Sequence, residues 1–195
     1  MLNILDSWVN WIVNVLLLSD NMNLHTKITL VLSFLILFTT SCLKPESFPK
    51  EPTLEFVGFE ALGDSGKLNF SFTDGDGDIG LTQTQLDSPF DTSSYFYYNL
   101  YIHYYEKMDG VWVRATADPG GNNFPTADSI TFAYRLENIT PSGQNTALRG
   151  EIEVILEPFY FNTNSNHNDS LKYEILLIDR SLNISNIIET PLIVR

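Results

Sequence analysis

From residue 53 to the C-terminus, apolar residues recur at every second position in short segments, and no segment shows the 3.6-residue period of an amphipathic helix. In the segment 67–73, for example, Leu68, Phe70 and Phe72 alternate with polar residues, which makes one face of an extended chain apolar. This pattern predicts half-buried β-strands, and Pro191 suggests that the last of them lies at an edge. We expect about eight strands, at residues 54–62, 67–73, 95–106, 111–115, 129–136, 149–157, 171–179 and 185–194.

The number and spacing of these strands predict the fold class. About eight short strands in about 140 residues are typical of a β-sandwich or a barrel. We therefore predict an all-β fold, an immunoglobulin-like β-sandwich domain at residues 53–195, with no second domain. In that topology the strands at 67–73 and 149–157 share one sheet, and the other sheet contains the strands at 95–106, 171–179 and 185–194. We assume this topology, which puts the loops that follow 67–73 and 171–179 at the same end of the sandwich.

The N-terminal part of the chain contains two apolar blocks, of which the second has the order of features of a secretory signal. Residues 1–21 contain no Lys or Arg, so we interpret them as upstream sequence translated in error or as an extension of the signal. Residues 22–41 begin with Met22 and contain Lys27, followed by an apolar run too short for a comfortable membrane span. We expect this segment to be the signal peptide; the alternative is one long signal anchor from residue 1.

Small residues directly precede Cys42, the only cysteine of the chain. The segment Thr39-Thr40-Ser41-Cys42, with Leu37 two residues further back than is usual, resembles the lipobox of bacterial lipoproteins. The resemblance implies cleavage before Cys42 and lipidation of that cysteine, which would anchor the chain to the outer membrane, on its periplasmic or its outer surface. The proline-rich residues 42–52 would then be a tether between lipid and domain. The alternative is that Cys42 is an ordinary buried thiol.

The strand at 67–73 runs directly into a segment in which aspartate and glycine alternate, Asp74-Gly75-Asp76-Gly77-Asp78-Ile79-Gly80. Carboxylates at alternate positions suit Ca²⁺, which takes about six to eight oxygen ligands, and glycines let a short loop fold those oxygens inward. Without a cation, carboxylates this close would repel one another, which raises at least one pKa. We therefore predict a calcium site. The segment is not an EF-hand loop, because glycine falls at the seventh position and Gln85 replaces the final glutamate.

Strand parity adds a fourth carboxylate to this site. Asp74 continues the apolar face of the strand before it, and Asp179 does the same for the strand at 171–179. If these strands lie in opposing sheets, the two carboxylates face each other at the edge of the core, which is unfavourable unless a positive charge lies between them. Asn183, in the turn that follows, could add a neutral oxygen. The alternatives are aspartate turns with Arg180 as the counter-charge, or a solvated loop without a cation.

The lipobox, the Asp-Gly segment and the closing segment Ile178-Asp179-Arg180-Ser181-Leu182-Asn183-Ile184-Ser185-Asn186 occur in one chain. In this order they resemble uncharacterised Bacteroidetes lipoproteins with immunoglobulin-like domains, and the closing segment is similar to the last hairpin of bacterial Ig-like repeats. The likeness spans most of residues 37–194. It implies a location in the cell envelope and supplies no catalytic residues.

Composition narrows the classes of function. Asp and Glu number 24 against 11 Lys and Arg, a net charge of −13, and such a surface repels phosphate backbones, so we expect no nucleic-acid partner. One cysteine excludes an internal disulfide framework and a Cys-rich zinc site. The sequence contains no nucleophile elbow, P-loop, dinucleotide fingerprint or zinc-protease motif, and His103 and His167 are isolated. We therefore expect no enzymatic activity.

These observations predict a non-enzymatic cell-envelope lipoprotein with a calcium-stabilised immunoglobulin-like domain that serves as a binding or assembly module for an unidentified protein or glycan. The alternative is a carbohydrate-binding module of an envelope glycan-uptake system. In that case sugar rings would stack on the tyrosines expected along the outer face of the strand at 95–106, which are Tyr95, Tyr97, Tyr101 and Tyr105. A competing interpretation is that this strand is central and its outer face is covered.

Overall fold

The computed structural model describes residues 23–26, 28–29, 47–116, 129–141 and 146–195. The predictions for residues 1–21, for most of 22–41 and for Cys42 lie outside these residues. The chain divides into two compact units, Met1–Pro45 and Glu46–Arg195, and the second contains the predicted domain. Within the described residues, we find no helix with the length and apolar character needed to cross a membrane.

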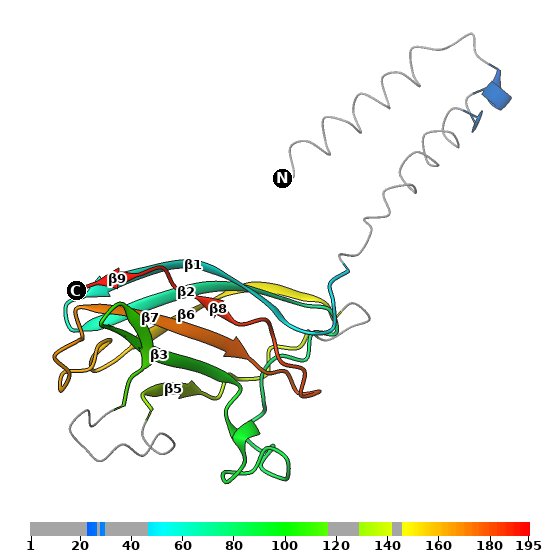
Figure 1. Cartoon of the computed structure of the whole chain (residues 1–195). Coiled ribbons are helices and arrows are strands. Elements are labelled where there is room, and N and C mark those ends of the chain that lie inside the picture. Colours follow the sequence, from blue (N-terminus) through cyan, green and yellow to red (C-terminus); the bar gives the residue numbers. More distant parts are fainter. Residues whose placement is uncertain (1–22, 27, 30–46, 117–128, 142–145) are drawn as a thin grey trace. The chain divides into compact units, whose positions relative to one another are not determined.

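The second unit is an all-β sandwich, as the alternation of apolar residues predicts (Figure 1). Its strands are β1 (Thr53–Leu62), β2 (Ser65–Asp74), β3 (Leu100–Met108), β4 (Val111–Arg114), β5 (Thr131–Tyr134), β6 (Leu148–Leu156), β7 (Ser170–Leu177), β8 (Ile188–Glu189) and β9 (Ile193–Val194). One sheet has three strands in the order β1-β2-β6. The other has six strands, with the path β4-β3-β7-β8, to which β5 is added on β3 and β9 on β7.

The expected division of strands between the sheets is confirmed. Strand β2 pairs with β6 in one sheet, and β3 pairs with β7 in the other. Strand β5, from the segment 129–136, joins the larger sheet by pairing with the first half of β3. Strand β4 pairs with the second half of β3. This division of strands is that of an immunoglobulin-like sandwich, in which two antiparallel sheets pack face to face over one core.

The core lies between the inward faces of the two sheets. Leu68 and Phe70 of β2 are fully buried, and the polar residues between them face outward. On the facing sheet, Tyr104 and Tyr173 are fully buried with ring centroids 5.9 Å apart. Each large side chain removed from water in this way stabilises the fold by about 1.5–3 kcal/mol. Packing of the two apolar faces therefore fixes which residues at the strand ends also face inward.

The strand predicted at 95–106 begins only at Leu100, so the prediction for its first residues is wrong. Tyr95–Tyr97 forms a short 3-10 helix, η1, and the Ser94 hydroxyl oxygen caps it by accepting the Phe96 N–H at 3.0 Å. The alternating aromatic residues predicted a strand here, but the Ser94 side chain gives the backbone a local hydrogen bond that a neighbouring strand would otherwise supply, and a turn forms.

The strand predicted at 185–194 is divided into β8 and β9. Pro191 lies between them and has no N–H to donate to a sheet. Just before it, the Thr190 N–H donates to the Tyr173 carbonyl at 3.0 Å, and the Thr190 hydroxyl oxygen accepts the Tyr173 N–H at 3.1 Å. Both short strands pair with β7 at the end of the sheet, so the edge position predicted from Pro191 is confirmed.

Candidate metal centre

The Asp-Gly segment and the turn after β7 come from opposite sheets and lie together at one end of the sandwich. Strand β2 ends at Asp74, and the segment continues from it without a break. The Arg180 N–H donates to the Asp78 carbonyl at 3.2 Å, which joins the two loops directly. The shared end that the topology implied is therefore present, and it brings carboxylates that are remote in sequence within reach of one another.

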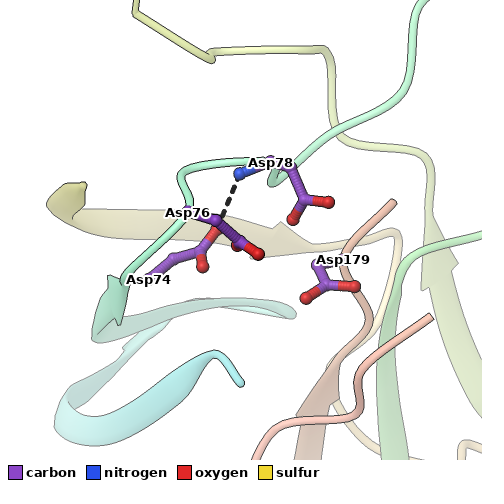
Figure 2. A group of neighbouring side chains, drawn as sticks. All are labelled: Asp74, Asp76, Asp78 and Asp179. Carbon is purple, nitrogen blue, oxygen red and sulfur yellow. Dashed lines mark hydrogen bonds between the residues drawn. The ribbon is translucent and has the colours of Figure 1, made fainter. Parts of the chain in front are cut away.

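The glycines of the segment are required by close contacts with neighbouring backbone. Gly77 has a φ of +66°, which L-residues with a Cβ rarely adopt, and a Cβ there would lie 1.7 Å from the Thr146 carbonyl oxygen. A Cβ on Gly75 would lie 2.2 Å from the Phe48 carbonyl oxygen. The loop can therefore press against two other parts of the chain while the aspartates between its glycines converge (Figure 2).

Four aspartates form a compact cluster at this end. Asp74, Asp76, Asp78 and Asp179 each offer a carboxylate oxygen, and these four oxygens all lie within 4.8 Å of one another. Asp74 is 0% exposed and Asp179 is 2% exposed, whereas Asp76 and Asp78 are half-buried. Figure 2 shows the carboxylates from the loop directed towards the one from the turn after β7. This cluster could hold a metal ion.

Hydrogen bonds satisfy only part of the cluster. The Asp78 N–H donates to Asp74 Oδ2 at 2.9 Å, and the Ser181 hydroxyl donates to Asp78 Oδ2 at 2.7 Å. The other oxygen of each of these carboxylates, together with Asp76 Oδ1, is buried and has no hydrogen-bond partner. Buried polar atoms are almost always paired, so three such oxygens in one place favour a bound proton or a bound cation. A hard cation with oxygen ligands fits this donor set.

Asn183 holds Asp179 in place with two hydrogen bonds. Its main-chain N–H donates to Asp179 Oδ1 and its side-chain Nδ2 donates to Asp179 Oδ2, each at 2.8 Å. Both contacts use nitrogen atoms, so in this arrangement Asn183 positions a carboxylate of the cluster. Its predicted role as a direct oxygen ligand stays a prediction.

Burial and mutual repulsion change the acidity of the two innermost carboxyls. Burial, together with the neighbouring carboxylates of Asp76, Asp78 and Asp179, raises the pKa of Asp74 from its ordinary value of 3.8 to about 7. Burial also raises the pKa of Asp179, although the hydrogen bonds from Asn183 act in the opposite direction. Near neutral pH the cluster therefore either binds a proton or carries unfavourable negative charge. A divalent cation would displace the proton and neutralise the negative charge.

Arg180 is not the counter-charge of the cluster in this structure. Its guanidinium donates to the Thr140 hydroxyl at 2.5 Å. The ion pairs between described residues join Lys67 to Glu60, and Lys172 to Glu174 and Glu189, and none of them involves a cluster aspartate. The alternative that arginine neutralises the site is therefore not supported.

The tyrosines considered for sugar stacking are largely engaged within the protein. Tyr101 is only 7% exposed; its hydroxyl donates to the Tyr95 carbonyl, and the two rings stack with centroids 4.8 Å apart. The Tyr105 hydroxyl donates to the Glu174 carboxylate at 2.7 Å. Tyr97 lies beneath the Arg135 guanidinium, 4.9 Å from its ring centroid. These contacts agree with the interpretation that the outer face of β3 is covered.

Sequence reasoning missed Ser181 as a member of the site. Its hydroxyl bonds to Asp78 across 103 residues of sequence. A serine in a turn is ordinary turn chemistry, and no pattern in the chain relates it to an aspartate so far away. Only the meeting of the two loops reveals the contact.

No family model, no curated protein and no solved structure matches this chain. The fold and the cluster nevertheless define a class of protein. The chain contains an all-β sandwich domain with a four-aspartate candidate metal centre between the loops of opposing sheets at one end.

Proposed function

We propose that this chain is a non-enzymatic lipoprotein of the cell envelope, whose β-sandwich is stabilised by calcium and serves as a binding or assembly module. The observation that carries the calcium part is the set of unpartnered buried oxygens on Asp74, Asp76 and Asp78, close to the Asp179 carboxylate. A folded domain that buries carboxylate oxygens without donors gains stability from any cation that replaces the lost hydration.

The proposed ligands are the carboxylates of Asp74, Asp76, Asp78 and Asp179, with Asn183 as a further oxygen donor or as the group that orients Asp179. Calcium is favoured over magnesium because it accepts a variable number of oxygens in flexible geometry, whereas Mg²⁺ demands a compact octahedron and keeps several waters. Zinc is disfavoured because the cluster offers neither histidine nor thiol.

The role of the cation would be mechanical. Asp74, Asp76 and Asp78 belong to the loop after β2, and Asp179 follows β7 in the other sheet. One ion bound to both loops would therefore fasten the two layers of the sandwich together at this end. Such a cross-link would suit a module that must keep its shape in the cell envelope.

The anchoring part of the proposal rests on the sequence. The order of positive charge, apolar run, small residues and Cys42 supports lipidation of that cysteine, and the proline-rich residues 42–52 support a tether to the outer membrane. The net charge of −13 supports a partner other than nucleic acid. A protein or a glycan would then be the partner of the module.

The carbohydrate-binding alternative receives less support from the geometry. The ring of Tyr101 and the hydroxyl of Tyr105, which would have to contact sugars, are used in internal contacts. Tyr95, one of the four tyrosines predicted to stack on sugars, is 51% exposed, and Tyr98 nearby is 40% exposed.

Thermal melting of the full chain in detergent, with calcium or with a chelator, tests the proposal. Calcium at about 100 times its dissociation constant should add about 2.7 kcal/mol to the free energy of unfolding. For a chain of this size that gain corresponds to a rise of about 5–10 °C in the melting midpoint. Magnesium at the same concentration serves as the matched control and should give a smaller rise. Equal midpoints in calcium and chelator would remove the calcium site from the proposal.

A further inference from the structure

The last part of the tether, residues 47–52, packs against the loop that carries the aspartates. We call these residues the tether end and residues 74–80 the metal loop. The Gly75 N–H donates to the Pro49 carbonyl at 2.7 Å. The Arg149 guanidinium lies over the ring of Phe48, 5.0 Å from its centroid. The tether end is therefore part of the folded domain and is held by contacts with the metal loop and with β6.

This contact depends on the conformation of the metal loop. Gly75 stands between two of the clustered aspartates, and a Cβ on it would lie 2.2 Å from the Phe48 carbonyl oxygen and 2.6 Å from that of Pro49. The backbone at Gly75 is therefore in close contact with the backbone carbonyls of Phe48 and Pro49, with no room for a side chain. A small displacement of Gly75 would break its hydrogen bond to Pro49 or drive the loop into the tether end.

The same loop carries the charges that a cation would neutralise. Asp74 and Asp76 flank Gly75, and an oxygen of each is buried without a hydrogen-bond partner. With no cation, repulsion among the carboxylates favours loop conformations that expose these oxygens to water. Such conformations displace Gly75, because its neighbours on both sides are the groups that move.

We propose that the metal loop is a cation-controlled clasp for the tether: a divalent cation at the aspartate cluster holds the loop in the shape that binds Phe48 and Pro49, and loss of the cation releases the tether end. This inference rests on the proposed cation site. Release of residues 47–52 would add up to about 20 Å of extended chain in front of the domain. Calcium would then set how far the module reaches, in addition to how stable it is.

Limited proteolysis of the full chain in detergent tests the clasp. The endoproteinase Lys-C cleaves after lysine, and Lys50 is exposed within the tether end, so its cleavage reports whether this segment is free. We expect calcium to slow cleavage after Lys50 by about tenfold relative to chelator, because proteolysis follows the population of the open form. Mass spectrometry identifies the fragment that begins at Glu51.

The variant Phe48→Ala should uncouple the clasp from the cation site. Cleavage after Lys50 should be fast with or without calcium, while the calcium-induced rise in melting midpoint remains. Phe159→Ala, which truncates an exposed phenylalanine outside the tether end and the metal loop, is the matched control and should keep the calcium-dependent protection. Hydrogen exchange of peptides that contain the Gly75 amide gives a second measurement, and calcium should slow it in the parent chain.

The outcomes distinguish the two proposals. A calcium-induced rise in midpoint with no change in cleavage after Lys50 or in exchange at Gly75 would overturn the clasp and leave the calcium site standing. No rise in midpoint would overturn the calcium site and the clasp with it.

Discussion

The Ser181 hydroxyl donates a hydrogen bond of 2.7 Å to the Asp78 carboxylate, although 103 residues separate the two in sequence. The adjacent Arg180 N–H donates to the Asp78 carbonyl at 3.2 Å. The loops from opposing sheets are thus joined by hydrogen bonds that need no ion. These two bonds hold the Asp78 end of the loop against the turn after β7, and a cation would add links through the carboxylates of both loops.

Replacement of Asp74 by asparagine should have opposite effects with and without calcium. In chelator at neutral pH, Asp74→Asn removes a buried negative charge among other carboxylates, so we expect stabilisation by about 1–3 kcal/mol. In calcium, the loss of a ligand should remove most of the rise in melting midpoint. The exposed Asp87 provides the control: Asp87→Asn should leave both midpoints unchanged. Destabilisation of Asp74→Asn in chelator would contradict the view that this carboxylate is under strain from its neighbours.

Asp179 links the turn after β7 to the site, and its removal tests the pairing of the two loops. Asp179→Ala should lower the metal-free stability by about 1–3 kcal/mol, because both Asn183 donors lose their acceptor. It should also abolish most of the calcium-induced rise. Melting curves of Asp169→Ala, which changes an exposed aspartate outside the cluster, provide the comparison. If Asp179→Ala keeps the full rise, the cation is bound by the Asp-Gly segment alone.

The raised pKa of Asp74 predicts a pH dependence of the metal-free protein. The folded chain holds this proton up to about pH 7, whereas the unfolded chain releases it near the ordinary value of 3.8. The stability contributed by the protonated group is therefore complete below about pH 4 and is lost as the pH rises to about 7. The difference in unfolding free energy between the parent and Asp74→Asn, measured in chelator, isolates this group and should shift in favour of the variant over that range.

Calcium should reverse this trend because it competes with the proton for the same oxygens. The calcium-induced rise in midpoint should increase from about pH 5 to about pH 7 and then level off. Calorimetry in buffers of different ionisation enthalpy should detect proton release on binding below about pH 7. Binding without proton release at about pH 6 would show that Asp74 is already ionised there.

Tyr101 is expected to act in stability rather than in sugar recognition. Tyr101→Ala removes a buried ring that stacks on Tyr95, so the free energy of unfolding should fall by about 2–4 kcal/mol. Tyr98→Ala, at a more exposed ring, should lower it by less than about 1 kcal/mol. Denaturant melts compare the two. Glycan binding that Tyr98→Ala or Tyr95→Ala abolishes without loss of stability would instead favour the carbohydrate-binding alternative.

Lipidation of Cys42 predicts the mass of the mature protein. The form isolated from membranes should begin at Cys42 and carry acyl chains, whereas Cys42→Ala should keep residues 22–41 and carry no acyl chains. Intact mass spectrometry and fractionation measure both effects. A mature species that begins before residue 42, or one without acyl chains, would contradict the anchor and leave the predictions for the aspartate cluster unaffected.

The sandwich and the four aspartates of the candidate metal centre were predictable, from strand periodicity and from the Asp-Gly segment. Alternation in segments such as 67–73 requires one apolar and one polar face, and two apolar faces must bury against each other. Once β2 and β7 lie in opposing sheets, their parity places Asp74 and Asp179 at the edge of the core. The same reasoning failed at Tyr95–Tyr97, where the Ser94 cap formed a turn within an alternating pattern.

Which strand residues face inward follows from the alternation in the sequence, because side-chain direction along a strand is fixed by covalent geometry and repeats every two residues. The sequence by itself could not determine contacts between chain segments that meet only after folding. The direction of the Arg180 guanidinium towards Thr140, the Ser181 hydrogen bond to Asp78 and the docking of Pro49 on Gly75 are contacts of this kind. Each depends on a rotamer or a backbone approach chosen by the whole packed structure, and no local pattern encodes that choice.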